Sequence, residues 1–173
     1  MEYIYRYHSK IGVLTLVSDG IALTGLWIKK GMYLEDSKVS EVDAKSLPVF
    51  KTTIKWLDDY FDGKEPGCMP PLKAEGTKFR KMVWDLLLEI PYGKVVTYGE
   101  IAKKIAKQMR REKMSAQAVG GAVGSNPISI LIPCHRVVGI NGNLTGYGGG
   151  LDVKEYLMEV EGMDMEQFHR PTK

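Results

Sequence analysis

The sequence predicts an α/β (α+β) fold in which a small antiparallel sheet with one helix precedes a helical second domain. Alternating residues and a Ser-Asp-Gly turn are confined to residues 3–28, a pattern typical of β-hairpins. Helical spacing of apolar residues dominates from Phe50 onwards. Residues 63–76 are rich in glycine and proline and predict a linker. The expected domains are therefore residues 1–76 and 77–173.

In the first domain we expect strands near residues 3–7, 13–17 and 21–28. Residues 29–45 are polar and lack clear periodicity, which indicates a loop or an edge segment. A helix should begin near Pro48, because proline is favoured in a first helical turn. Gly63 is expected to end that helix. The aromatic residues of this domain, including Trp27 and Trp56, are interpreted as core.

The second domain begins with helix signals of two kinds. Thr77 can cap a helix whose apolar stripe stops before Pro91. The run Thr97-Tyr-Gly-Glu100 has the form of a capping box, in which threonine and glutamate each satisfy a free backbone N–H. A short helix is therefore expected directly after Thr97.

Ser115 can cap another short helix over residues 116–124. Two successive short helices indicate a helix-turn-helix motif, although their connection exceeds the usual three or four residues. A plain helical pair packed on the core is the alternative. The second helix is rich in alanine and glycine, Ala118 and Gly121 among them. It lacks the side-chain reach for major-groove base edges and suits close backbone approach to a neighbouring helix or to a narrow minor groove.

The C-terminal part of the sequence gives two further predictions. Residues 139–150 contain six glycines, which indicates a flexible loop suited to lining a pocket. Residues 151–161 predict a helix ended by Gly162. Residues 163–173 carry no strong signal, and we expect them to fray.

Composition excludes several classes of protein. Hydrophobic residues at 44% and charged residues at 26% are typical of a globular chain. No apolar run approaches the ~20 residues that span a bilayer, and residues 1–8 lack the hydrophobic block of a signal peptide. We therefore expect a cytoplasmic protein without membrane contact. Cys68 and Cys134 are then expected to be free thiols. No CxxC or HxxxH spacing occurs, so no metal site is predicted.

Basic residues are concentrated in the second domain. Residues 77–173 carry 14 basic and 10 acidic side chains, against 10 and 11 in residues 1–76. Eight of the basic residues lie between Lys94 and Arg136. A charge run is usually only a solvated face, but one that coincides with a helical pair favours a nucleic-acid interface.

One short motif could carry chemistry. Pro133-Cys134-His135-Arg136-Val137 follows the apolar run of residues 128–132. Such a pair is usually a buried structural cysteine beside a surface histidine. The alternative is a nucleophile whose thiol is activated by the neighbouring imidazole.

The surroundings of this motif resemble a known family. Asn126-Pro-Ile-Ser-Ile-Leu-Ile-Pro-Cys-His-Arg-Val137, preceded by Ala118-Val-Gly-Gly and followed by Thr145-Gly-Tyr-Gly-Gly-Gly-Leu, is similar to the O6-alkylguanine-DNA alkyltransferases, also called methylated-DNA–protein-cysteine methyltransferases. The resemblance covers residues 77–162. It implies a ribonuclease-H-like first domain and a winged-helix or helix-turn-helix-like second domain.

The resemblance also implies a reaction. An alkyl group on guanine O6, or less often on thymine O4, moves irreversibly to Cys134 in a single turnover and without a cofactor. His135 accepts the thiol proton through a water, and Glu161 orients His135. The implied partner is alkylated double-stranded DNA, whose damaged base is flipped out of the duplex. We expect the protein to act as a monomer.

Binding residues follow from the same resemblance. Those implied to hold the extruded base are Tyr98, Asn126, Val137, Tyr147 and Gly148. Those implied to contact DNA are Gln117, Ala118, Gly121 and Arg136. Gln117 departs from the family pattern, because many members have an arginine there that fills the space left by the flipped base. Ser129 also stands where some relatives have proline, and Lys154 aligns with a family lysine near the active site.

Two other functions remain open at this point. A related class of proteins binds damaged bases without chemistry, but its members typically carry tryptophan at the position of Cys134. A helix-turn-helix regulator with a redox-sensing thiol would explain the basic segment and one reactive cysteine. That second alternative leaves Asn126 and the glycine-rich loop unexplained.

Overall fold

The computed structural model describes residues 2–28, 39–43, 46–147 and 150–171. The chain divides into two compact units. The first consists of Met1–Glu75 with Pro127–Leu131, and the second of Gly76–Asn126 with Ile132–Lys173. Each unit has its own buried residues and its own hydrogen-bond pattern.

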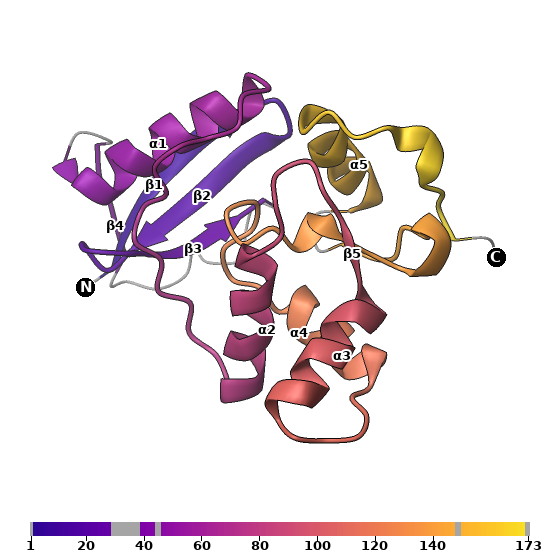
Figure 1. Ribbon diagram of the computed structural model, residues 1–173. Coiled ribbons are helices and arrows are strands. Elements are labelled where there is room, and N and C mark those ends of the chain that lie inside the picture. The colour runs from indigo at the N-terminus through magenta and orange to yellow at the C-terminus, as the bar shows by residue number, and fades with distance from the viewer. Residues whose placement is uncertain (1, 29–38, 44–45, 148–149, 172–173) are drawn as a thin grey trace. The chain divides into compact units, whose positions relative to one another are not determined.

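The first unit is built on a four-stranded sheet with the order β3-β2-β1-β4 (Figure 1). Its strands are β1 Glu2–Ser9, β2 Gly12–Ser18, β3 Leu23–Trp27 and β4 Val39–Glu41. The three predicted strands pair antiparallel, whereas β4 pairs parallel to β1. Strand β4 lies in the segment for which the sequence predicted a loop or an edge.

One face of this sheet packs against helix α1, Pro48–Phe61 (Figure 1). The register places Tyr5 opposite Leu16, so both side chains share that face. The ring centroids of Tyr5 and Phe50 are 6.1 Å apart, and Leu16 and Phe50 are fully buried. Pro48 occupies the first turn of α1, and Gly63 follows with a φ of 78°. The predicted bounds of this helix are confirmed.

A short segment distant in sequence completes the first unit. The backbone N–H of Leu26 donates to the carbonyl of Pro127 at 2.9 Å, and the N–H of Ser129 donates to the carbonyl of Leu26 at 3.2 Å. Ile128 is fully buried. Ile130 has a φ of 72°, which is strained for a β-branched residue. No sequence pattern predicts this return of the chain, because it depends on long-range backbone pairing.

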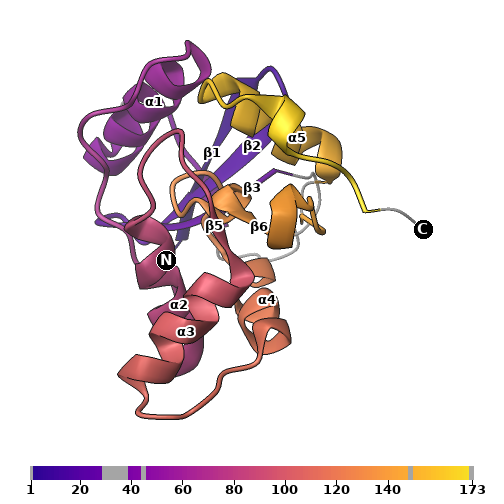
Figure 2. The ribbon, with the colours of Figure 1, turned by 45° about the vertical axis from the view of Figure 1, so that its right-hand side comes forward.

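The second unit is mainly helical. Its helices are α2 Lys78–Leu88, α3 Tyr98–Gln108, α4 Ala116–Gly124 and α5 Leu151–Val160, with the short parallel strands β5 Val96–Thr97 and β6 Val137–Val138. Helices α2, α3 and α4 contact one another, and Figure 2 shows α3 beside α4. Across the described ranges, no helix has both the length and the apolar character that crossing a bilayer requires.

The predicted caps of these helices are present. Thr77 accepts from the N–H of Arg80 at 3.1 Å, and Ser115 accepts from the N–H of Ala118 at 3.2 Å. Thr97 and Glu100 form the reciprocal capping box, with distances of 3.1 and 2.9 Å. Local side-chain chemistry therefore determines where three of the helices begin.

The prediction that the C-terminal residues fray is wrong for residues 163–171. Met163, Met165 and Phe168 pack against the buried cluster of Val138, Leu144 and Met158. The N–H of Leu144 donates to the carbonyl of His169 at 2.7 Å. Arg170 forms ion pairs with Asp152 and Glu155. The apolar residues of this terminus are irregularly spaced, so periodicity did not reveal that they pack.

Replacing Thr97 with alanine should lower the free energy of unfolding by about 1 kcal/mol, because the N–H of Glu100 loses its acceptor. Urea denaturation measures this change. Thr97→Ser is the matched control, since it keeps the hydroxyl oxygen and should stay close to the unaltered chain. Equal losses in both variants would contradict a capping role for this hydroxyl.

Candidate active site

Cys134 lies at the start of a tight turn in the second unit. The 3-10 helix η2, Cys134–Arg136, follows Pro133 and leads directly into β6. Val137 of β6 pairs with Val96 of β5, and Figure 2 shows these two strands side by side. The side chain of Cys134 is buried, with 7% of its surface exposed. The turn and the strand pair therefore fix the position of the sulfur.

The surroundings of Cys134 act on its thiol in opposite directions. Burial raises the pKa of the thiol, because an apolar environment disfavours the thiolate. Hydrogen bonds with the side chains of Asn126 and Tyr147 and the charge of Lys154 counteract that rise. Asn126 is held in place because its amide also donates to the carbonyl of Ile132 at 2.7 Å. The sulfur is thus enclosed by groups that favour its charged form.

His135 is fully buried and forms a short hydrogen bond through Nε2 to Oε2 of Glu161. Burial lowers the pKa of His135, and the Glu161 carboxylate counteracts that change. A neutral imidazole with its proton on Nε2 donates to the carboxylate and keeps Nδ1 as an acceptor. This tautomer is the one that a general base beside Cys134 requires.

Glu161 joins three segments of the unit. Its second oxygen, Oε1, accepts from the backbone N–H of Gly93 at 2.9 Å and from Nε of Arg136 at 2.8 Å. Burial by itself would raise the pKa of Glu161, but its hydrogen bond with His135 and the other partners lower it to about 2. The carboxylate is therefore ionised and fully hydrogen-bonded, as a buried charge must be.

Arg136, for which the resemblance implied a DNA contact, is only 7% exposed. Besides Glu161, its guanidinium donates to the carbonyl of Ile90 at 2.8 Å and lies 5.7 Å from the ring centre of Tyr92. Its contacts are internal, so Arg136 holds Glu161 and the turn after α2 in place.

Lys154, which the resemblance placed near the active site without a role, is a buried cation. It is fully buried in α5, and its Nζ donates to the carbonyl of Val137 at 2.7 Å. Burial lowers the pKa of Lys154 to about 8, and its interaction with Cys134 counteracts that change. The helix pattern could have revealed it, because Lys154 shares the buried stripe with Leu157 and Met158.

A cavity of about 920 Å³ lies among α3, α4 and the loop after β6. Tyr98, Gln117 and Gly120 line it together with Gly139, Ile140 and Thr145. Thr145 donates to the hydroxyl of Tyr98 at 2.8 Å. Ala118 and Gly121 are also exposed on α4. Of the remaining predicted residues, Gly148 lies outside the described residues.

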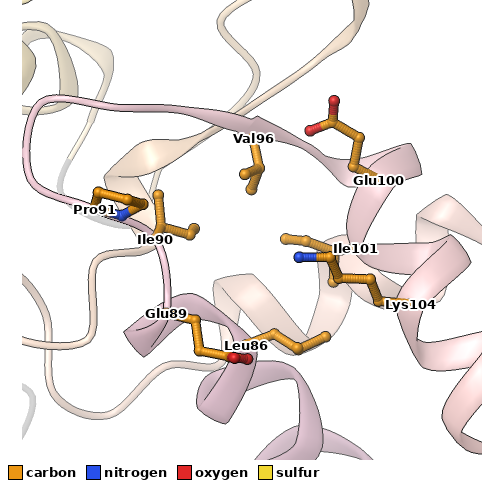
Figure 3. A pocket seen from close by; sticks show the side chains of 8 residues that line it. All are labelled: Leu86, Glu89, Ile90, Pro91, Val96, Glu100, Ile101 and Lys104. Atoms are coloured by element: carbon orange, nitrogen blue, oxygen red, sulfur yellow. The ribbon is translucent and has the colours of Figure 1, made fainter.

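A second cavity of about 230 Å³ lies between the end of α2 and the start of α3. Figure 3 shows the side chains of Ile90, Val96 and Ile101 directed into it. Glu89 and Glu100 also line it, together with Leu86, Pro91 and Lys104. Two carboxylates do not favour a phosphate ligand, and none of the predicted site residues contributes to this cavity.

The chain was compared with known families and proteins. The ribonuclease-like domain of 6-O-methylguanine DNA methyltransferase matches residues 3–70, and the DNA-binding domain of the same family matches residues 78–163. The two matches cover most of both units. They agree with the resemblance that the sequence around Cys134 suggested.

Relatives match over nearly their whole length. The methylated-DNA–protein-cysteine methyltransferase of Haemophilus influenzae is 44% identical over 161 residues, covering 92% of this chain and 86% of that protein. The Methanosarcina acetivorans protein of the same name is 41% identical over 160 residues, covering 92% and 98%. The solved structure of Mycobacterium tuberculosis OGT in complex with DNA has a TM-score of 0.79 and 37% identity, covering 96% and 94%. This chain therefore belongs to the methylated-DNA–protein-cysteine methyltransferase family.

Proposed function

We propose that this chain repairs alkylated DNA by direct reversal, moving the alkyl group of O6-alkylguanine, and also that of O4-alkylthymine, to the sulfur of Cys134. The observation that supports this most strongly is the buried His135–Glu161 contact beside a buried cysteine. Nucleophile, base and orienting carboxylate are the parts that nucleophilic catalysis requires. Membership of the family supplies the reaction class.

In the proposed step, Nδ1 of His135 accepts the thiol proton through one water. The sulfur attacks the alkyl carbon, so that an S–C bond forms as the C–O6 bond breaks. The electron pair of the broken bond stays on guanine, which takes up the proton that His135 held. Glu161 stabilises the imidazolium while it exists. The product thioether has no easy leaving step, so each molecule acts once and needs no cofactor.

Lys154 has a separate electrostatic role in this step. Its ammonium is buried, and the carbonyl of Val137 is neutral. A thiolate on Cys134 would neutralise the charge of the Lys154 ammonium, which the Val137 carbonyl cannot do. Because a nearby cation favours a thiolate, we infer that Lys154 promotes ionisation of Cys134 and at the same time orients the Val137 carbonyl.

The reaction requires a base that has left the duplex, since O6 lies within the base stack. Extrusion costs roughly a few kcal/mol and costs least for a mispaired lesion. We propose that α4 enters the minor groove, where Ala118 and Gly121 allow close approach and Gln117 takes the place of the extruded base. Tyr98, Asn126, Val137 and Tyr147, with Gly148, then hold the base. We propose that the chain binds alkylated double-stranded DNA as a monomer. The solved structure of the M. tuberculosis relative in complex with DNA supports DNA as the binding partner.

Mixing the chain with a duplex that contains one O6-methylguanine should add one methyl group to the peptide that carries Cys134. Mass spectrometry of the digested protein measures this addition. Cys134→Ala should abolish it. Cys68 is an exposed free thiol, so Cys68→Ala is the matched control and should react normally. A methyl group on Cys68, or binding of the duplex without any gain in mass, would refute the proposal.

Gln117→Ala should weaken binding of a lesion-containing duplex by roughly threefold to tenfold, because the orphaned partner base loses a hydrogen bond. Gln117→Arg should strengthen binding and steepen its salt dependence, since a cation is added near phosphates. Fluorescence anisotropy at several salt concentrations measures both effects. Gln108, exposed at the end of α3, provides the control variant Gln108→Ala. If neither Gln117 variant changes affinity, Gln117 does not contact DNA.

Lys154→Met should raise the pKa of the Cys134 thiol, because the nearby cation is removed. Reaction of Cys134 with iodoacetamide should then be severalfold slower at neutral pH and should recover as the pH rises. Lys81→Met, on the exposed side of α2, is the control and should leave the profile in place. An unchanged profile in a folded Lys154→Met protein would show that Lys154 is only structural.

A further inference from the structure

Ile140 is an apolar side chain in an unusual place. It begins the 3-10 helix η3, Ile140–Gly142, and is 78% exposed. It also lines the 920 Å³ cavity that contains Tyr98 and Gln117. A single exposed isoleucine is ordinary on a protein surface. Whether Ile140 is a binding residue therefore depends on how rigid its turn is and on which other residues line the cavity.

The turn that carries Ile140 is held from both ends. The N–H of Gly139 donates to the carbonyl of Asn143 at 2.7 Å, and the N–H of Asn143 donates to the carbonyl of Ile140 at 3.2 Å. Asn141 has a φ of 58° and Gly142 a φ of 79°. These left-handed conformations restrict which residues the turn accepts.

The C-terminal segment fixes the same turn from outside. The N–H of His169 donates to the carbonyl of Gly142 at 3.0 Å. A Cβ added to Gly142 would collide with the carbonyl oxygen of Gln167. Met165 and Phe168, on either side of Gln167, pack against the buried cluster of Val138, Leu144 and Met158. The backbone of Ile140 is thus preorganised, and binding through its side chain loses little conformational entropy.

The chemistry of the cavity favours an apolar contact at this position. Lys103 and Glu100 are the charged side chains that line it, and the other lining residues are neutral. Gln117 also lacks a charge, so this wall has little to attract phosphates. Proteins that bind the minor groove frequently insert isoleucine and other apolar side chains between base steps, so an apolar side chain is an ordinary partner for this groove.

We propose that Ile140 is a DNA contact that packs its side chain against the deoxyribose rings and base edges of the minor groove beside the extruded nucleotide. This inference rests on the proposed function, because it takes the cavity to be the DNA-binding face. The contact is apolar and preorganised, and it adds affinity for DNA in a chain that lacks an arginine at position 117.

Ile140→Ala should weaken binding of a lesion-containing duplex by roughly tenfold, as expected for loss of a buried aliphatic side chain. The slope of log affinity against log salt should not change, since no phosphate contact is lost. Ile140→Lys should steepen that slope by about 0.9, because one further counterion is released. Anisotropy titrations at several salt concentrations measure both quantities.

Ile21 offers a matched control, since it is 80% exposed and does not line this cavity. Ile21→Ala and Ile21→Lys should leave affinity and slope unchanged. Thermal unfolding of each variant checks that the turn is intact. If Ile140→Ala binds as tightly as the unaltered chain, the contact is refuted. The proposed function would survive that result if the unaltered chain gains one methyl group on Cys134 after mixing with the same duplex.

Discussion

The hydrogen bond between His135 and Glu161 is the interaction on which the second unit depends. Glu161 is buried at the end of α5, and its two oxygens have different partners: His135 on one side, and Arg136 with the N–H of Gly93 on the other. A buried carboxylate without such partners costs several kcal/mol. The turn after α2, the turn at Cys134 and the end of α5 therefore meet at one residue. The geometry that orients the imidazole is the same geometry that holds these segments together.

The fixed charges around Cys134 have the signs that the proposed proton transfer from sulfur to imidazole requires. Arg136 and Glu161 neutralise each other through their ion pair. Lys154 donates to a neutral carbonyl. If the thiol proton moves to His135 as proposed, the new positive charge lies beside the Glu161 carboxylate. The new negative charge appears on the sulfur, where Lys154 opposes the effect of burial. Each charge that develops in the proposed step would thus meet a fixed charge of opposite sign, which lowers the cost of separating charges in a buried site.

Sequence reasoning succeeded where the cause is local and failed where it is distant. The caps at Thr77, Thr97 and Ser115 and the three antiparallel strands of the first unit follow from neighbouring residues. The family resemblance pointed to Cys134, His135 and Glu161, and the structure brings the last two into contact. The inward direction of Arg136 could not be predicted, because its acceptors lie 25 and 46 residues away. The packing of residues 163–171 and the pairing of Pro127 with Leu26 depend in the same way on contacts that no local pattern encodes.

The cavity has few charged side chains, whereas the surface around it carries exposed basic residues. The basic residues of α3 and of the connection to α4 are exposed, yet among the described residues Lys103 is the one that lines the large cavity. Exposed cations attract duplex DNA regardless of its sequence and lose that attraction as salt rises. Apart from Lys103 and Glu100, the cavity is lined by small residues, hydroxyls, two side-chain amides and one isoleucine, which respond to shape. In the proposed mode of recognition, discrimination would depend on how readily a base leaves the duplex, and a lesion that pairs poorly leaves most readily. In the proposed complex, a neutral Gln117 in the vacated stack would keep attraction and discrimination separate, because it would add no charge-driven affinity for undamaged DNA.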